Sequence, residues 1–373
     1  MFPEKNCPPA ARPPPGGPPA AGETPAPADA ARPLLALSTC WCSGRHTDGG
    51  AMLREMAGLG FSHVELSHGI RVTLVPGILK ALGEGVVRVA SVHNFCPLPA
   101  GINRPAPNAF EPSSADATER DQWLRQTRRS LDFAQQTGAR VLVAHLGRVR
   151  FFWRNPVRRL LAKAAAQWAK RADAADAAGA AAFAGAASPA AGPPFAAAPR
   201  FAAERERARK KLAARMSPYW ERVKQGAGEI SAYADRLGVA LGFENRERPD
   251  ELPFDGAFEE LLDGIARPRT AGYWHDTGHA QIKQQLGFID HRAHLEKLAP
   301  RLLGFHLHDT DAAGRDHLPP GEGEVDFDMV SRFWQPHHVL VLELAPGTRP
   351  EDVKKSRNRI EELLAARKLR PAR

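Results

Sequence analysis

The chain has 373 residues, of which 43% are hydrophobic and 25% charged, and its formal net charge is +9. This length allows one large domain or two small ones, with a core that needs no disulfide support. No apolar run approaches the roughly 18 residues of a membrane span, which excludes integral membrane proteins. Four cysteines are too few for a disulfide scaffold, so we expect reduced thiols and a cytoplasmic location.

The positive charge is concentrated in two segments. Residues 148–224 contain 17 Lys and Arg against 5 Asp and Glu, and residues 349–373 contain 9 against 4. The remainder of the chain is acidic. An acidic body argues against a duplex-binding protein, although the basic internal segment argues weakly for one. We therefore do not expect nucleic acid or a membrane as a partner.

The first 33 residues hold 11 of the 33 prolines, with Ala and Gly in most of the gaps. Such a segment has too few apolar residues to pack a core, and we predict a disordered tail over residues 1–33.

From residue 34 onward, short apolar runs alternate with longer amphipathic stretches. The runs are nearly continuous in apolar character, as expected of strands buried on both faces. They are Leu34–Cys40, Phe61–Leu66, Val86–Val92, Arg140–His145, Val239–Glu244, Gly272–Asp276, Leu302–His308 and Val339–Leu344. Helical stripes lie between them, and Gly138 and Gly238 provide two helix ends.

Eight strand–helix units predict an α/β protein with a (β/α)₈ TIM barrel over residues 34–373. An open doubly wound sheet is the alternative. Against it, no Gly-x-Gly-x-x-Gly follows the first strand, and polar residues end almost every strand.

One segment is too long for a minimal barrel. Residues 148–216 form a predicted insertion after the fourth strand, with basic, helix-compatible flanks at Arg148–Arg171 and Glu204–Arg215. The Ala/Gly/Pro-rich middle, Ala172–Ala203, lacks the apolar periodicity to pack, and we predict that it is dispensable.

Seven of the eight strands place a His, Asp or Glu at or near the carboxyl end, where TIM barrels collect their chemistry. These residues are Glu65, His93, His145, Glu244, Asp276, His306 with His308, and Glu343. Charged side chains are rarely buried unless they are paired or bind a metal. Each residue alone has an ordinary structural explanation, but several at one level predict a metal site. By strand alternation His275 points away from Asp276, and we assign it a structural role, as we do His63, His294 and His337.

Five motifs together resemble the xylose isomerase-like TIM-barrel superfamily. They are Glu244-Asn245-Arg246, Asp276-x-x-His279, Gly304-Phe305-His306-Leu307-His308-Asp309, the loop from Asp316 to Gly323, and Glu343-x-x-Pro346. This superfamily includes sugar (phosphate) isomerases and epimerases, and apurinic endonucleases of the endonuclease IV type. The resemblance covers residues 34–366 apart from the insertion.

The resemblance implies one divalent metal, Mn²⁺, Zn²⁺, Mg²⁺ or Fe²⁺, held by Glu244, Asp276, His306 and Glu343. It also implies further metal or substrate contacts from His93, His145, His279, His308 and His317. In the endonuclease type, His93, His145 and His317 would complete a three-metal cluster. This sequence departs from that pattern at Arg315, where the family has an Asp two residues before the loop histidine.

The expected function is isomerisation or epimerisation of a small carbohydrate or its phosphate. Glu244 and Glu343 would remove and return the proton beside a carbonyl, while the metal stabilises the enediolate. Arg246, Arg148 and Arg315 are candidate substrate contacts, and a second copy of the chain is a candidate partner in a homo-oligomer. The alternatives are a metal-dependent phosphodiesterase or lyase on the same barrel, and a barrel that only binds a sugar.

Overall fold

The structure, a computed structural model, describes residues 32–181, 195–265 and 270–366. The tail predicted over residues 1–33 lies outside the described residues except for its last two positions.

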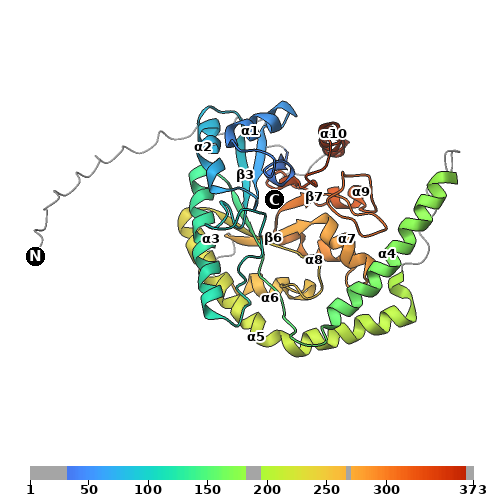
Figure 1. Cartoon of the computed structure of the whole chain (residues 1–373). Helices are drawn as coiled ribbons and strands as arrows, with labels where there is room; N and C mark the ends of the chain where they lie inside the picture. Colours follow the sequence, from blue (N-terminus) through green and yellow to red (C-terminus); the bar gives the residue numbers. More distant parts are fainter. Residues whose placement is uncertain (1–31, 182–194, 266–269, 367–373) are drawn as a thin grey trace, which may run out of the picture.

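The described strands close into one parallel barrel in chain order (Figure 1). They are β1 (Leu34–Ser38), β2 (His63–Leu66), β3 (Arg88–His93), β4 (Val141–Ala144), β5 (Ala240–Glu244), β6 (Ala271–Asp276), β7 (Leu302–Leu307) and β8 (Val339–Leu342). The barrel closes where β8 pairs with β1, with Leu34 opposite Val339. This confirms the predicted TIM barrel and excludes the open sheet. Several strands end one or two residues before the predicted runs, because the polar residues that follow leave the ladder.

Helices surround the barrel (Figure 1). They are α1 (Gly49–Gly58), α2 (Val75–Gly83), α3 (Ala117–Thr137), α4 (Pro156–Ala181), α5 (Pro199–Leu237), α6 (Phe258–Asp263), α7 (Thr277–Gln285), α8 (His291–Leu298), α9 (Phe327–Ser331) and α10 (Pro350–Ala366). The ends predicted at Gly138 and Gly238 are confirmed. Both glycines adopt the left-handed conformation just after α3 and α5, which few other residues adopt without strain.

Alternating strand residues supply two separate cores. Leu340 and Leu342 of β8 belong to the large core between the sheet and the helices, whereas Val339 and Val341 belong to a smaller core inside the barrel. Trp274 fills much of that interior. A Cβ atom on Gly304 would lie 2.5 Å from the Trp274 ring, so only glycine leaves room there. The interior is therefore a packed floor beneath the polar strand ends.

The insertion is more ordered than the sequence predicts. Helices α4 and α5 lie along the outside of the barrel (Figure 1), and α5 runs without a break from the insertion to the turn before β5. Phe201 and Ala196 are buried with Leu160 of α4 and Leu286 at the end of α7. The prediction that Ala172–Ala203 packs against nothing is therefore wrong for its last residues. The missed signal is Phe201, a lone aromatic residue in the first turns of an amphipathic helix.

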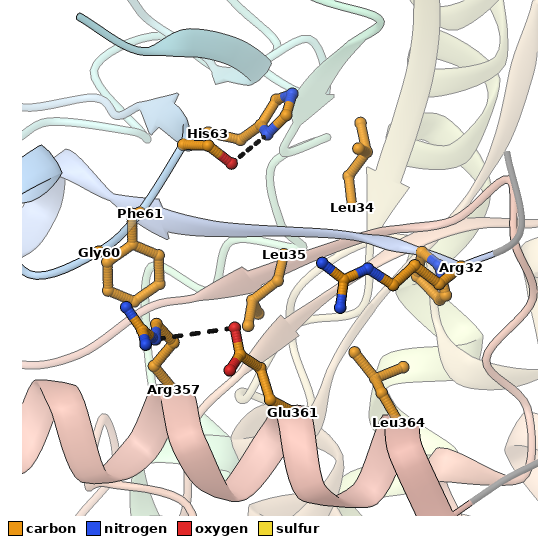
Figure 2. A pocket seen from close by; sticks show the side chains of 11 residues that line it. Arg32, Leu34, Leu35, Gly60, Phe61, His63, Arg357, Glu361 and Leu364 are labelled. Carbon is orange, nitrogen blue, oxygen red and sulfur yellow. Dashed lines mark hydrogen bonds and ion pairs between the residues drawn. The ribbon is translucent and has the colours of Figure 1, made fainter. Parts of the chain in front are cut away.

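A small cavity of about 80 Å³ opens at the amino end of the barrel, between β1, β2 and α10 (Figure 2). Arg357 lies over it, paired with Glu361 at 3.7 Å and hydrogen-bonded to the Leu59 carbonyl oxygen at 2.8 Å. This cavity is at the opposite end of the strands from the polar cluster. None of the described helices is long and apolar enough to cross a bilayer.

Candidate active site

Four carboxylates and one imidazole converge at the carboxyl ends of the strands. They are Glu65, Glu244, Asp276, His306 and Glu343, each at most 4% exposed. The Nδ1 atom of His306 lies at the centre, 3.1 Å from a Glu343 oxygen and 3.8 Å from oxygens of both Glu244 and Asp276. The structure thus brings together all four residues of the expected metal set, from four consecutive strands.

The cluster fits a divalent cation. His306 Nε2 lies 3.1 Å from Glu65 Oε2, so this nitrogen carries the proton and Nδ1 presents a lone pair to the other carboxylates. Nδ1 is buried and has no hydrogen-bond partner among the described residues. A lone pair facing three buried carboxylates is unfavourable unless a positive charge lies between them. Carboxylate oxygens and an imidazole nitrogen suit Mn²⁺, Zn²⁺, Mg²⁺ or Fe²⁺.

The neighbouring carboxylates also shift the pKa of His306. Burial alone would lower this pKa, but the Glu343 and Glu65 carboxylates raise it well above its usual value. Without a metal, Nδ1 of His306 therefore takes up a second proton, which offsets part of the negative charge and which a bound cation would replace.

Glu65 is the site residue whose role the sequence did not reveal. Its Oε1 accepts a hydrogen bond from Ser38 at 3.0 Å, and its Oε2 accepts one from Ser91 at 2.8 Å. Burial opposes ionisation of Glu65, but His306 and His93 lower its pKa to about 2. The sequence does place Glu65 at a polar strand end, which marks it as a candidate site residue. Its role was missed because its partners, Ser38, Ser91 and His306, come from three other strands and share no sequence motif with it.

Glu244 is surrounded by cationic and imidazole groups. His145 Nε2 lies 2.9 Å and His93 Nε2 3.1 Å from its Oε2, while Arg246 Nη1 lies 2.8 Å from its Oε1. His279 Nδ1 approaches Oε1 at 3.1 Å. Burial opposes ionisation, but the charge of Arg246 holds the pKa of Glu244 well below its usual value. Glu244 is therefore a carboxylate.

Asp276 is fixed by its position between β6 and α7. Its Oδ1 accepts the backbone hydrogen bond of His279 at 2.7 Å and so caps the helix. His308 Nε2 lies 3.0 Å from its other oxygen. Asn245 ties the strand ends together, because its side chain bonds both the backbone N–H and the carbonyl of Asp276. Burial lowers the pKa of His279, but Asp276 raises it to about 9.

The loop after β7 is organised around Asp309. Its carboxylate accepts backbone hydrogen bonds from Thr310, Gly321 and Val325. The loop places His317 in a stack on His308, with ring centroids 4.2 Å apart. The backbone N–H of His317 donates to His308 Nδ1, so both nitrogens of His308 are engaged within the protein.

Two of the arginines expected to bind substrate pair with carboxylates outside the cluster. Arg148 lies 3.0 Å from buried Glu111. Arg315 pairs with Asp311, four residues earlier, and its side chain is 77% exposed. The structure brings only Arg246 into the buried group.

Two of the histidines assigned a structural role, His275 and His294, lie behind the sheet. His275 Nδ1 and His294 Nε2 both contact the Tyr273 hydroxyl, at 2.8 and 2.9 Å, and His275 Nε2 lies 2.9 Å from His291 Nε2. The alternation argument that turned His275 away from Asp276 is therefore correct.

The fold is shared with sugar epimerases of known structure. A D-tagatose 3-epimerase-like protein is 16% identical, with a TM-score of 0.57 over 89% of this chain and 97% of that one. A 3-keto-D-glucoside 4-epimerase from E. coli is 13% identical, with a TM-score of 0.57 over 89% and 100% of the two chains. A D-allulose 3-epimerase from Methylomonas sp. is 15% identical, with a TM-score of 0.57 over 89% and 98%. Identities this low show a common fold alone.

A search of the curated proteins found no match. Residues 163–363, more than half of the chain, match the family described as xylose isomerase-like TIM barrel. The match begins inside the insertion and extends through the strand ends that supply Glu244, Asp276, His306 and Glu343. This chain belongs to the xylose isomerase-like TIM-barrel family.

Proposed function

We propose that this protein is a divalent-metal-dependent isomerase or epimerase of a small sugar or sugar phosphate. The support is threefold: the family, the epimerases among the proteins of similar structure, and the chemistry of the cluster. The observation that carries the proposal is His306 Nδ1, a buried nitrogen that faces three carboxylates and has no hydrogen-bond partner among the described residues. Residues 34–373 would act as one catalytic domain, with the insertion 148–216 attached to it.

Glu244, Asp276, His306 and Glu343 would hold the metal. A bound divalent metal supplies positive charge to the carbonyl and hydroxyl oxygens of a sugar, which makes the neighbouring carbon more acidic.

Glu244 and Glu343 would exchange the proton with that carbon. They come from β5 and from the residue after β8, and His306 lies between them. One carboxylate takes the proton from one face of the sugar, and the other returns a proton to the opposite face. Arg246 holds Glu244 ionised, which suits it to accept a proton. His93, His145, His279, His308 and His317, with Arg148, Arg246 and Arg315, remain candidate substrate or metal contacts.

A second candidate function is hydrolysis of a phosphodiester by several metals, as in the endonuclease IV type. The observation that favours it is the approach of both His93 and His145 to one oxygen of Glu244. Two imidazoles and a carboxylate form a ligand set for a second cation.

Deuterium exchange distinguishes the two candidate functions, because only isomerisation or epimerisation exchanges a carbon-bound proton of a sugar with solvent. Incubation of the Mn²⁺-loaded protein with candidate ketoses in D₂O is expected to place deuterium on the carbon beside the carbonyl, because a carboxylate exchanges its proton with solvent. Mass spectrometry measures the label. An abasic oligonucleotide should stay intact under the same conditions. Incision of that oligonucleotide without deuterium uptake by any sugar would favour the second candidate.

A matched set of variants tests the metal ligands. Asp276→Asn and His306→Ala should lower the metal content of the purified protein while circular dichroism stays unchanged. Asp255→Asn is the control, because Asp255 pairs with Lys283 away from the cluster. Full metal content in both ligand variants would rule out this ligand set.

A further inference from the structure

We propose that the guanidinium of Arg246 supplies the second positive charge of this site and so restricts the protein to one metal ion. This inference rests on the proposed function, because it assumes that Glu244, Asp276, His306 and Glu343 bind a metal.

The guanidinium of Arg246 lies among the groups around Glu244 that the second candidate function would use to bind a further ion. The Nε2 atoms of His93 and His145 lie 3.1 and 2.9 Å from Glu244 Oε2, and all three side chains are at most 5% exposed. Arg246 Nη1 lies 2.8 Å from Glu244 Oε1 and 2.8 Å from His145 Nε2. One nitrogen of the guanidinium thus contacts two of the three groups that would otherwise bind a second ion.

The proton positions on His145 explain why a cation is needed. Its Nδ1 lies 2.9 Å from the side-chain oxygen of Asn108, which accepts a hydrogen bond and keeps the proton on Nδ1. A guanidinium has only donors, so the Nε2 atom of His145, 2.8 Å from Arg246 Nη1, carries no proton. Its Nε2 therefore presents a lone pair toward the Glu244 carboxylate. Two facing lone pairs repel each other unless a donor or a cation joins them, and Arg246 donates to both residues.

Arg246 is buried in this position between two carboxylates. It is only 8% exposed, and Glu251 lies 3.6 Å from its Nε. Glu244 and Glu251 both face it, and an arginine side chain does not lose its proton in proteins. Its charge is therefore permanent at any pH at which the protein is folded.

A fixed guanidinium and a divalent ion cannot share these donors. At separations of about 3 to 4 Å, two positive charges repel strongly in a buried site, where the effective dielectric is low. A second metal would have to expel Arg246 from a buried position and separate it from Glu244 and Glu251. A single metal with Arg246 beside it suits proton transfer at a sugar, whereas hydrolysis by a metal cluster requires the second ion.

Metal stoichiometry tests this directly. Metal-free full-length protein is titrated with Co²⁺ or Zn²⁺ by calorimetry, and elemental analysis counts the ions retained. We expect one equivalent for the wild type and for Arg246→Lys, which keeps the charge. Arg246→Met should bind two equivalents, and the double variant Arg246→Met/His145→Ala should return to one. The matched control is Arg248→Met, because Arg248 lies in the same loop and pairs with Asp250 instead of Glu244.

The outcomes separate this inference from the proposed function. No bound metal in the wild type would refute the metal-dependent function. Two equivalents in the wild type would leave that function standing and overturn the role of Arg246, whether or not the variants fold. One equivalent in a folded Arg246→Met protein would overturn it as well, because removal of the guanidinium would then have opened no site.

Discussion

The Oε2 atom of Glu65 lies 3.1 Å from Nε2 of His306, although the two residues are 241 positions apart and come from β2 and β7, across the barrel. This contact decides which nitrogen of His306 faces the other carboxylates. Ser38 and Ser91 hold both oxygens of Glu65, so the carboxylate is itself oriented. A carboxylate behind a histidine ligand fixes the ring and increases its basicity.

Loss of this carboxylate should weaken metal binding. Glu65→Ala is expected to lower the affinity for Mn²⁺ about 10- to 100-fold, the usual effect of removing such a partner. Glu65→Gln should bind more tightly than Glu65→Ala, because its amide oxygen still accepts the His306 proton. Calorimetric titration of the metal-free proteins measures both. Glu111→Gln is the control, since Glu111 is a buried carboxyl paired with Arg148 away from the cluster. Unchanged affinity in Glu65→Ala would contradict the orienting role.

The sequence predicted the barrel and its polar strand ends because both depend on local patterns. Apolar runs broken by His, Asp or Glu mark strand ends wherever they occur in the chain. The partners of each side chain depend on the closed barrel, which no local pattern contains. Arg246 shows the difference: its proximity to Glu244 follows from the two-residue spacing, but its contact with His145 follows only from the pairing of β4 with β5.

Two buried histidines behind the sheet should make the protein sensitive to acid. Burial lowers the pKa of His291 to about 3 and that of His294 to about 4. Both rings are therefore neutral in the folded protein, whereas the unfolded chain takes up protons below about pH 6.5. The contribution of these two neutral rings to the free energy of unfolding is fully present above about pH 6.5 and is lost as the pH falls toward 4. At pH 5, each histidine should lower the free energy of unfolding by about 2 kcal/mol relative to its value at neutral pH.

Urea unfolding at pH 7 and pH 5 measures this loss. His294→Met removes one of the two groups, and its free energy of unfolding should fall by about 2 kcal/mol less than that of the wild type between these pH values. Equal losses in both proteins would show that His294 is not the source of the acid sensitivity.

The floor of the site should tolerate no side chain at Gly304. A Cβ atom there would lie 2.4 Å from the Val339 carbonyl oxygen and 2.5 Å from the Trp274 ring, and the backbone atom cannot move aside cheaply. Gly304→Ala is expected to cost about 1–3 kcal/mol through overpacking. Gly228→Ala is the control, because this exposed position in α5 has no atom within 4 Å of a new Cβ. It should stabilise the helix by up to about 1 kcal/mol. A melting temperature that is higher for Gly304→Ala than for Gly228→Ala would contradict the conclusion that the barrel interior is tightly packed at Gly304.

The insertion is fastened to the barrel by one buried aromatic side chain. Phe201 is 5% exposed and packs with Leu160, Ala164 and Leu286, so it fastens α4 and α5 to α7. Phe201→Ala is expected to cost about 3–5 kcal/mol of local packing. The loss should appear as faster hydrogen exchange in α4 and the first half of α5, with the barrel strands unchanged. Phe152→Ala is the matched control, since Phe152 is 83% exposed and its removal leaves no cavity. Identical exchange in the two variants would mean that the insertion is held by something other than this apolar contact, and faster exchange throughout the barrel would mean that the insertion and the barrel unfold as one unit.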